Sequence, residues 1–172
     1  IRDSYWAISI ARFVDGEPAE AFLDIPSLRQ RIVAIRGQGA WRNQKRLTPE
    51  SRAVAGSSCV SLCSRSIRVL QKRPDQSFPG KIRLLGVASL NLVSVAMGQT
   101  AGALEATPKI WDIAAAWLVL TELDCPLIWL GPHPAHLEPG RDLSEMGFPV
   151  VAAGSRKQLE RLAPWGEFLR KS

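Results

Sequence analysis

The spacing of apolar residues in the first third of the chain predicts an antiparallel sheet. Residues 5–14 and 20–25 alternate between apolar and polar positions or run apolar, and the pair Asp15-Gly16 lies between them. A period of two residues is typical of a strand with one buried face, and Asp-Gly is a strong signal for a hairpin turn. We predict strands over residues 5–14, 20–25 and 31–36, followed by a turn over residues 40–44.

In the rest of the chain, short apolar runs alternate with longer segments of helical periodicity. Gly98 is expected to end one of these helices. Alternating strands and helices indicate a layered α/β fold. A small and polar segment at residues 49–57 marks a boundary, so we predict two domains, residues 1–52 and 53–172. The predicted strands cover residues 60–62, 82–85, 102–105, 127–130 and 149–153, and the predicted helices cover residues 65–72, 89–97, 108–123 and 155–163.

Two carboxylates lie on either side of a predicted strand-to-helix junction. Glu105 closes the strand, and Asp112 follows seven residues later near the helix start, with Thr107 as the expected N-cap and Pro108 as the first helical residue. Backbone N–H groups at a helix N-terminus favour an anion. Two facing carboxylates suit a hard divalent cation or a polyol. The alternative is that Asp112 only supports the helix start and that Glu105 is a solvated strand end.

Four short segments around these carboxylates follow one another in a specific order. They are the segment Gly86-Val87-Ala88-Ser89-Leu90-Asn91, the helix end Val95-Ala96-Met97-Gly98, the strand that ends at Glu105, and Trp111-Asp112-Ile113-Ala114-Ala115. In this order, and with seven residues from Glu to Asp, they resemble the inositol monophosphatase family of magnesium-dependent phosphatases. The resemblance extends through residues 6–11, 14–18 and 37–40, and it covers most of the chain up to about residue 153.

The resemblance implies an α/β fold, a layered sandwich of the inositol monophosphatase and fructose-bisphosphatase type. It implies hydrolysis of a phosphate monoester by water, assisted by bound Mg²⁺. Asp112 corresponds to the catalytic aspartate that binds a metal ion and meets a substrate hydroxyl. Glu105 corresponds to the glutamate that binds the inositol ring, and Gly86, Val87 and Ala88 correspond to the turn that lines the sugar pocket. The expected ligand is a small phosphorylated polyol, and a homodimer is compatible with the resemblance.

The family's main metal motif does not occur in this sequence. Neither Asp-Pro-hydrophobic-Asp-Gly-Thr nor the glutamate upstream of it is found in the 172 residues, and the motif would immediately precede Ile1. An incomplete sequence, a processed or designed fragment and a genuine loss of the motif are the three explanations, of which the abrupt start favours a fragment that lacks the N-terminal part of the fold. We expect the 172 residues alone to be inactive, because Mg²⁺ keeps its water shell unless a preformed site offsets dehydration.

Two other functions stay open beside the phosphatase. One is a non-catalytic relative that binds sugar phosphates, and the other is a phosphatase of fructose bisphosphate or of 3′-nucleotides. The chain also departs from the family at residues 122–125, where Glu-Leu-Asp-Cys replaces Glu-Ala-Gly-Gly. Because both glycines are lost, Asp124 is the candidate for a positive φ at this helix end.

The composition and net charge of the chain add little to the choice among these functions. With 46% hydrophobic and 22% charged residues the chain is globular, and no apolar run reaches the length of a membrane span. The net charge of +6 comes without a nucleic-acid-binding motif, so we expect a solvated basic face and no nucleic-acid partner. The odd number of cysteines, Cys59, Cys63 and Cys125, argues against a disulfide framework and fits a reducing cytoplasm, and we expect Cys59 and Cys63 to be small buried residues.

Overall fold

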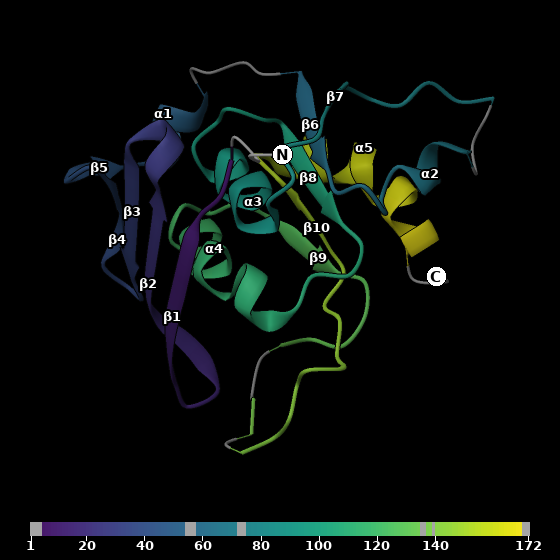
Figure 1. The fold of residues 1–172 in the computed structure, drawn as a ribbon. Coiled ribbons are helices and arrows are strands. Elements are labelled where there is room, and N and C mark those ends of the chain that lie inside the picture. Colours follow the sequence, from purple (N-terminus) through teal and green to yellow (C-terminus); the bar gives the residue numbers. More distant parts are fainter. Residues whose placement is uncertain (1–4, 54–57, 72–74, 135–136, 139, 170–172) are drawn as a thin grey trace.

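The computed structural model describes residues 5–53, 58–71, 75–134, 137–138 and 140–169. Its elements form four layers: a sheet of strands β1–β5 (sheet A), the helices α3 and α4, a second sheet of strands β6–β10 (sheet B), and helix α5 (Figure 1). This layered arrangement confirms the predicted α/β fold class. The first third of the chain, with its alternating apolar residues, forms sheet A. The rest of the chain, in which strands and helices alternate, forms sheet B and its helices.

Sheet A is antiparallel throughout, with neighbours in chain order. The predicted hairpin turn is confirmed, because Asp15 and Gly16 both adopt a positive φ between β1 and β2. The predicted turn over residues 40–44 is wrong in extent: Ala40 is fully buried within a strand, and only Asn43 and Gln44, both with positive φ, form the turn. The elements are β1 (Ile8–Val14), β2 (Glu17–Ile25), a 3₁₀ helix (Pro26–Leu28), β3 (Gln30–Ile35), β4 (Gly39–Arg42) and β5 (Lys45–Leu47).

Sheet B is mixed, with the strand order β7-β6-β8-β10-β9. Strands β7, β6 and β8 are parallel, and β10 runs antiparallel to both β8 and β9. All residues of β8 and β10 are buried, which is typical of strands with helices on both faces. The strands are β6 (Cys59–Leu62), β7 (Lys81–Arg83), β8 (Gly102–Glu105), β9 (Leu127–Trp129) and β10 (Val150–Ala153).

The four predicted helices occur in the predicted order with different bounds, and a short helix that the sequence did not predict, Pro49–Ala53, precedes them. Of the helix predicted over residues 65–72, only the short α2 forms within the described residues 65–71, and residue 72 lies outside them. Gly98 adopts a positive φ directly after α3, as expected for a residue that ends a helix. The helices are α1 (Pro49–Ala53), α2 (Arg68–Gln71), α3 (Ala88–Ala96), α4 (Ile110–Glu122), α5 (Arg156–Gly166) and a final 3₁₀ helix (Glu167–Leu169).

Helix α4 begins two residues later than the sequence predicts. Its N-cap is Lys109, not Thr107, and Pro108 lies outside the helix. Outside the helix, the carbonyl oxygen of Pro108 accepts a hydrogen bond from the N–H of Phe148 at 2.8 Å, a contact with a distant loop that the local sequence does not encode.

The far end of α4 holds sheet A in place. The carboxylate of Glu122 accepts hydrogen bonds from the N–H groups of Gly37 and Gly39, at 2.8 and 2.7 Å, at the turn between β3 and β4. Asp124 adopts the expected positive φ. The N–H of Cys125 then donates a hydrogen bond to the carbonyl oxygen of Leu120, which ends the helix.

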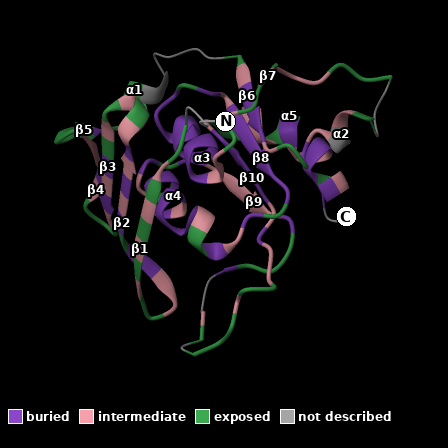
Figure 2. Ribbon diagram, in the orientation of Figure 1, coloured by how far each residue is buried: buried purple, intermediate pink, exposed green. Residues whose placement is uncertain are grey.

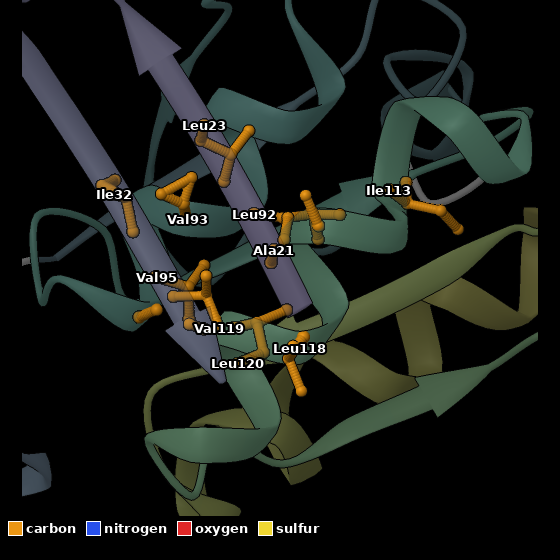
Figure 3. Packing of buried hydrophobic residues seen from close by; sticks show 14 of the residues in the cluster. Ala21, Leu23, Ile32, Leu92, Val93, Val95, Ile113, Leu118, Val119 and Leu120 are labelled. Atoms are coloured by element: carbon orange, nitrogen blue, oxygen red, sulfur yellow. The ribbon is translucent and has the colours of Figure 1, made fainter. Parts of the chain in front are cut away.

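Two hydrophobic cores lie between the layers. The larger lies between the sheets, where side chains of β2 and β3 such as Leu23 and Ile32 meet Val93 of α3 and Val119 of α4 (Figure 3). The smaller lies between sheet B and α5. The larger core contains residues from both sides of the predicted boundary at residues 52–53. The division into two domains stays a prediction.

The outer faces of the two sheets differ. Helix α5 covers sheet B, whereas alternate residues of β1 on the outer face of sheet A are exposed. In Figure 2, β1 of sheet A is coloured mainly as exposed and intermediate, whereas β8 and β10 of sheet B are coloured as buried.

Candidate functional site

A pocket of about 1070 Å³ lies at one edge of sheet B. Its walls come from residues that directly follow β6, β7 and β8, from the first turns of α3 and α4, and from the segment leading into β1. Strands β6, β7 and β8 are parallel, so their carboxyl ends meet at this edge. Ligands of open α/β sheets bind beyond such strand ends.

All five residues that the sequence singles out line this pocket. Gly86, Val87 and Ala88 form the turn into α3, Glu105 ends β8, and Asp112 lies in the first turn of α4. Gly86 has a φ of 77°, and a Cβ placed there would meet nothing within 4 Å. Backbone conformation, not space, therefore requires glycine at this turn.

Glu105 is buried, with 2% of its surface exposed. Its Oε1 accepts a hydrogen bond from Nδ2 of Asn91 at 2.6 Å. Burial raises the pKa of Glu105 to about 7, opposed by hydrogen bonds from Asn91 and Cys63 and reinforced by the negative charge of Asp112. The alternative of a solvated strand end is therefore wrong.

Asp112 is half-buried and supports the start of α4. Its Oδ2 accepts a hydrogen bond from the N–H of Lys109, the N-cap residue, at 2.8 Å. This contact satisfies a backbone donor at the helix start. Asp112 thus contacts the helix start as expected, and the same side chain also lines the pocket, so its role in the site stays a prediction.

Asn91 is a pocket residue to which the sequence analysis assigned no role. It is 1% exposed, and its Oδ1 has no hydrogen-bond partner among the described residues. Its place in the first half of a helix that follows a glycine turn is the signal that could have identified it. The pairing of its amide with Glu105 depends on the packing of α3 against β8, which no local pattern encodes.

Cys63 and Arg65 are two further pocket residues that the sequence analysis missed. Cys63 is half-buried, not fully buried as predicted, and its Sγ accepts hydrogen bonds from the N–H groups of Ser66 and Ala106, at 3.3 and 3.4 Å. The guanidinium of Arg65 donates a hydrogen bond to Oγ1 of Thr107. Because Arg65 is one of 22 Lys and Arg residues in the sequence, its charge alone does not identify it as a pocket residue.

The described residues do not by themselves fit a complete Mg²⁺ site. Within the part of the chain that the structure describes, no group of three or more His, Cys, Asp or Glu side chains is arranged to hold a metal ion. Glu105 and Asp112 offer at most two carboxylates, and Glu105 already binds Asn91. Mg²⁺ requires near-octahedral oxygen ligands. The role of Asp112 as a metal ligand stays a prediction.

No helix in the described ranges is long and apolar enough to cross a membrane.

Comparison with known proteins places this fold and pocket in a family. A model of the inositol monophosphatase family matches residues 1–164. The chain is 32% identical over 125 residues to an inositol-1-monophosphatase of Rhizobium meliloti, a match that covers 69% of this chain and 47% of that protein. It is 29% identical over 137 residues to the Nus factor SuhB of Xylella fastidiosa, with 69% of this chain and 46% of that protein covered. The chain thus spans about half the length of these relatives.

A solved structure agrees with the family model. An IMPase/NADP phosphatase complexed with NADP and Ca²⁺ has a TM-score of 0.69 and 26% identity, covering 91% of this chain and 59% of that one. Because the family model matches nearly all of the sequence, the chain belongs to the inositol monophosphatase family.

Proposed function

We propose that this chain forms the polyol-binding side of a magnesium-dependent phosphate monoester hydrolase. One observation carries the proposal: Asn91 presents a buried Oδ1 without a described partner beside the buried carboxylate of Glu105, and both residues line the pocket. A buried acceptor left unpaired destabilises the fold. Hydroxyl groups of a polyol are the donors that such a pair would bind.

The turn into α3 supports the same assignment. The N-cap residue Val87 makes no side-chain capping bond, so the first N–H groups of α3 have no side-chain partner from it. These N–H groups are donors for substrate oxygens, as at other helix N-termini. The chain's own residues would therefore hold the polyol between acceptors on one side and backbone donors on the other.

Asp112 would contact a substrate hydroxyl from the start of α4. Lys109 fixes one of its carboxylate oxygens, which restricts the orientation of the side chain. The metal chemistry of the family needs ligands beyond those that the described residues provide. The roles of Gly86, Val87, Ala88, Glu105 and Asp112 in binding, and of Asp112 in catalysis, belong to this proposal.

Calorimetric titration of the 172-residue chain with inositol 1-phosphate tests the binding role. At pH 8, above the pKa of about 7 at which Glu105 becomes charged, we expect Glu105→Gln to weaken binding by about tenfold, since a charge-assisted hydrogen bond is replaced by a neutral one. Asp112→Asn should weaken binding less, because its fixed oxygen is already engaged. Glu20→Gln, at an exposed carboxylate on sheet A, is the matched control and should bind like the wild type.

A phosphate-release assay separates the phosphatase from the non-catalytic alternative. The missing motif and the lack of a three-ligand cluster among the described residues favour binding without turnover in this chain. We expect no Mg²⁺-dependent release by the 172 residues. Turnover by the purified chain would contradict this, and unchanged affinity in Glu105→Gln would contradict the polyol-binding role.

A further inference from the structure

A second pocket, of about 650 Å³, lies at the opposite end of the parallel strands from the site described above. Its lining includes Ser58 before β6, Lys81 at the start of β7 and Ala101 before β8, together with residues of α5, and we call it the amino-end pocket. No described residue lines both pockets. The two cavities are therefore separate, at the amino and carboxyl ends of the same three strands.

Contacts on both sides hold the walls of the amino-end pocket. The N–H of Lys81 donates a hydrogen bond to the carbonyl oxygen of Ser58 at 2.9 Å, which attaches the start of β7 to the residue before β6. A Cβ on Gly80 would lie 2.7 Å from that same oxygen, so the two backbones are packed closely. The ring of Phe78 meets the ring of Trp165 of α5 edge-on, with centroids 5.0 Å apart. The cavity is therefore preformed, as ligand sites usually are.

The deep part of the amino-end pocket is apolar. Val60 and Leu162 are 1% and 2% exposed, and Phe78, Pro79 and Ala101 are half-buried. The volume of about 650 Å³ is within the range for pockets that bury a small ligand. An aliphatic or aromatic group would gain free energy by leaving water for this space.

The two charged residues in the described lining of the amino-end pocket are both cations. Lys81 comes from the start of β7 and Arg161 from α5, and both are exposed. Neither forms an ion pair with a carboxylate of the described residues. A guanidinium presents its N–H donors in a geometry that matches a carboxylate. Ser77 and Gln158 add neutral hydrogen-bonding groups. The mouth of the pocket therefore favours an anion.

We propose that the amino-end pocket is a second ligand site, which binds a small organic carboxylate with an apolar body. The carboxylate lies within reach of Lys81 and Arg161, and the apolar body contacts Phe78 and Leu162. A sugar phosphate fits less well, because the apolar depth of the pocket leaves its hydroxyl groups without hydrogen-bond partners. This site goes beyond the proposed polyol-binding function and does not depend on it, since the two pockets share no described residue.

Three probes separate the charge of such a ligand from its apolar body. 3-Phenylpropanoate carries both, 3-phenylpropanamide lacks the charge, and acetate lacks the apolar body. Each probe is titrated into the ¹⁵N-labelled 172-residue chain, and binding is followed by amide chemical shifts. We expect 3-phenylpropanoate to bind about tenfold more tightly than either of the others, because each of them lacks the charge-assisted hydrogen bond or the buried ring. The largest shifts should fall at residues 77–81 and 158–162.

Substitutions of the two cations test the charged mouth of the pocket. Arg161→Gln should weaken the binding of 3-phenylpropanoate about tenfold and leave that of 3-phenylpropanamide unchanged, whereas Arg161→Lys, which keeps a positive charge, should lose less. Lys81→Gln gives a second measurement from the opposite wall. Arg156→Gln is the matched control, at an exposed arginine of the same helix that does not line the pocket, and it should bind like the wild type. Circular dichroism checks that each variant is folded.

Four results would overturn the amino-end site. The first is equal affinity for 3-phenylpropanoate in the wild type, Arg161→Gln and Lys81→Gln. The second is equal affinity of the wild type for 3-phenylpropanoate and 3-phenylpropanamide. The third is a set of shifts at residues 62–65 and 84–89, which would place the probe in the pocket at the carboxyl ends of the strands. The fourth is displacement of 3-phenylpropanoate by an equal concentration of inorganic phosphate, which would show a general anion site without preference for an apolar body.

Discussion

Sheet A and sheet B bury their inner faces in the same core but differ on their outer faces. On sheet B, helix α5 covers the second face, and every residue of β8 and β10 is buried. On sheet A, β1 alternates along its length, and Ile8 and Ile10 are 44% and 58% exposed. The sequence pattern of a strand therefore reports how many of its faces are covered. A continuous apolar run indicates two covered faces, and alternation indicates one.

The largest effect should come from the cover of sheet B. Leu162 of α5 is 2% exposed. A Cβ added to Gly102 of β8 would lie only 2.3 Å from Cδ1 of Leu162, so the helix and the strand are in close contact. We expect Leu162→Ala to lower the free energy of unfolding by about 3 kcal/mol, through lost burial and a cavity. Urea unfolding measures the change. Leu23→Ala, at a fully buried leucine on the inner face of sheet A, should cost a similar amount.

One result would contradict this account of how α5 covers sheet B. If Leu162→Ala costs much less than Leu23→Ala, then α5 does not cover sheet B tightly, and the buried pattern of β8 needs another cause.

The carboxylates of the two sheets should respond to pH in opposite directions. Burial raises the pKa of Glu105 in sheet B to about 7, above its ordinary value of 4.5. Between these values the folded chain binds the proton more tightly than the unfolded chain, so the stability from this group falls as pH rises from about 4.5 to about 7. The hydrogen bond from Arg12 lowers the pKa of Glu20 in sheet A, so its small contribution is lost only as pH falls.

Urea unfolding at pH 5 and pH 8 measures the Glu105 effect. Relative to Glu105→Gln, we expect the wild type to lose up to about 3 kcal/mol over this range, since one pKa unit is worth about 1.4 kcal/mol. The matched variant Glu20→Gln should keep the wild-type pH dependence in this window. Parallel stability curves for wild type and Glu105→Gln would show that Glu105 does not titrate near neutral pH.

The link between sheet A and α4 should have an intermediate effect. In Glu122→Gln one carboxylate oxygen becomes an amide nitrogen, which cannot accept from the N–H of Gly37 or Gly39. We expect a loss of about 1.5–2 kcal/mol in the free energy of unfolding, at the lower end of the range for a hydrogen bond to a charged group. Thermal unfolding measures it. Glu145→Gln, at an exposed glutamate, is the control, and equal melting temperatures for the two variants would contradict the role of this contact.

The smallest effect should come from the outer face of sheet A. Ile10→Ala removes a side chain that is already 58% exposed, so we expect a change within about 0.5 kcal/mol. Unfolding at two protein concentrations measures it. A loss as large as that of Leu23→Ala, or one that grows with concentration, would mean that this face is buried against another chain in solution.

The features that the sequence predicts well depend on neighbouring residues alone. The Asp15-Gly16 hairpin, the strand that ends at Glu105 and the helix end at Gly98 follow from local backbone preferences. Strand β4 was missed because the burial of Ala40 and the positive φ of Gln44 depend on its partners in the sheet.

The same limit applies to the pocket. The ordered motifs predicted five residues that the structure brings together. They could not predict the start of α4 at Ile110 or the hydrogen bond that Phe148 donates to the carbonyl of Pro108 from a distant loop. They also missed the bond between Asn91 and Glu105 and the contact between Arg65 and Thr107, which join segments that only the fold brings together.

Helix α4 connects the pocket to the turn between β3 and β4 of sheet A. Asp112 lies at its first turn beside the pocket, and Glu122 at its last residue binds the turn between β3 and β4. At 1.5 Å per residue, these two carboxylates are about 15 Å apart along the axis. One helix thus carries a pocket residue in its first turn and the contact to sheet A at its last residue. We therefore expect a change that shifts α4 relative to sheet A to move Asp112 as well.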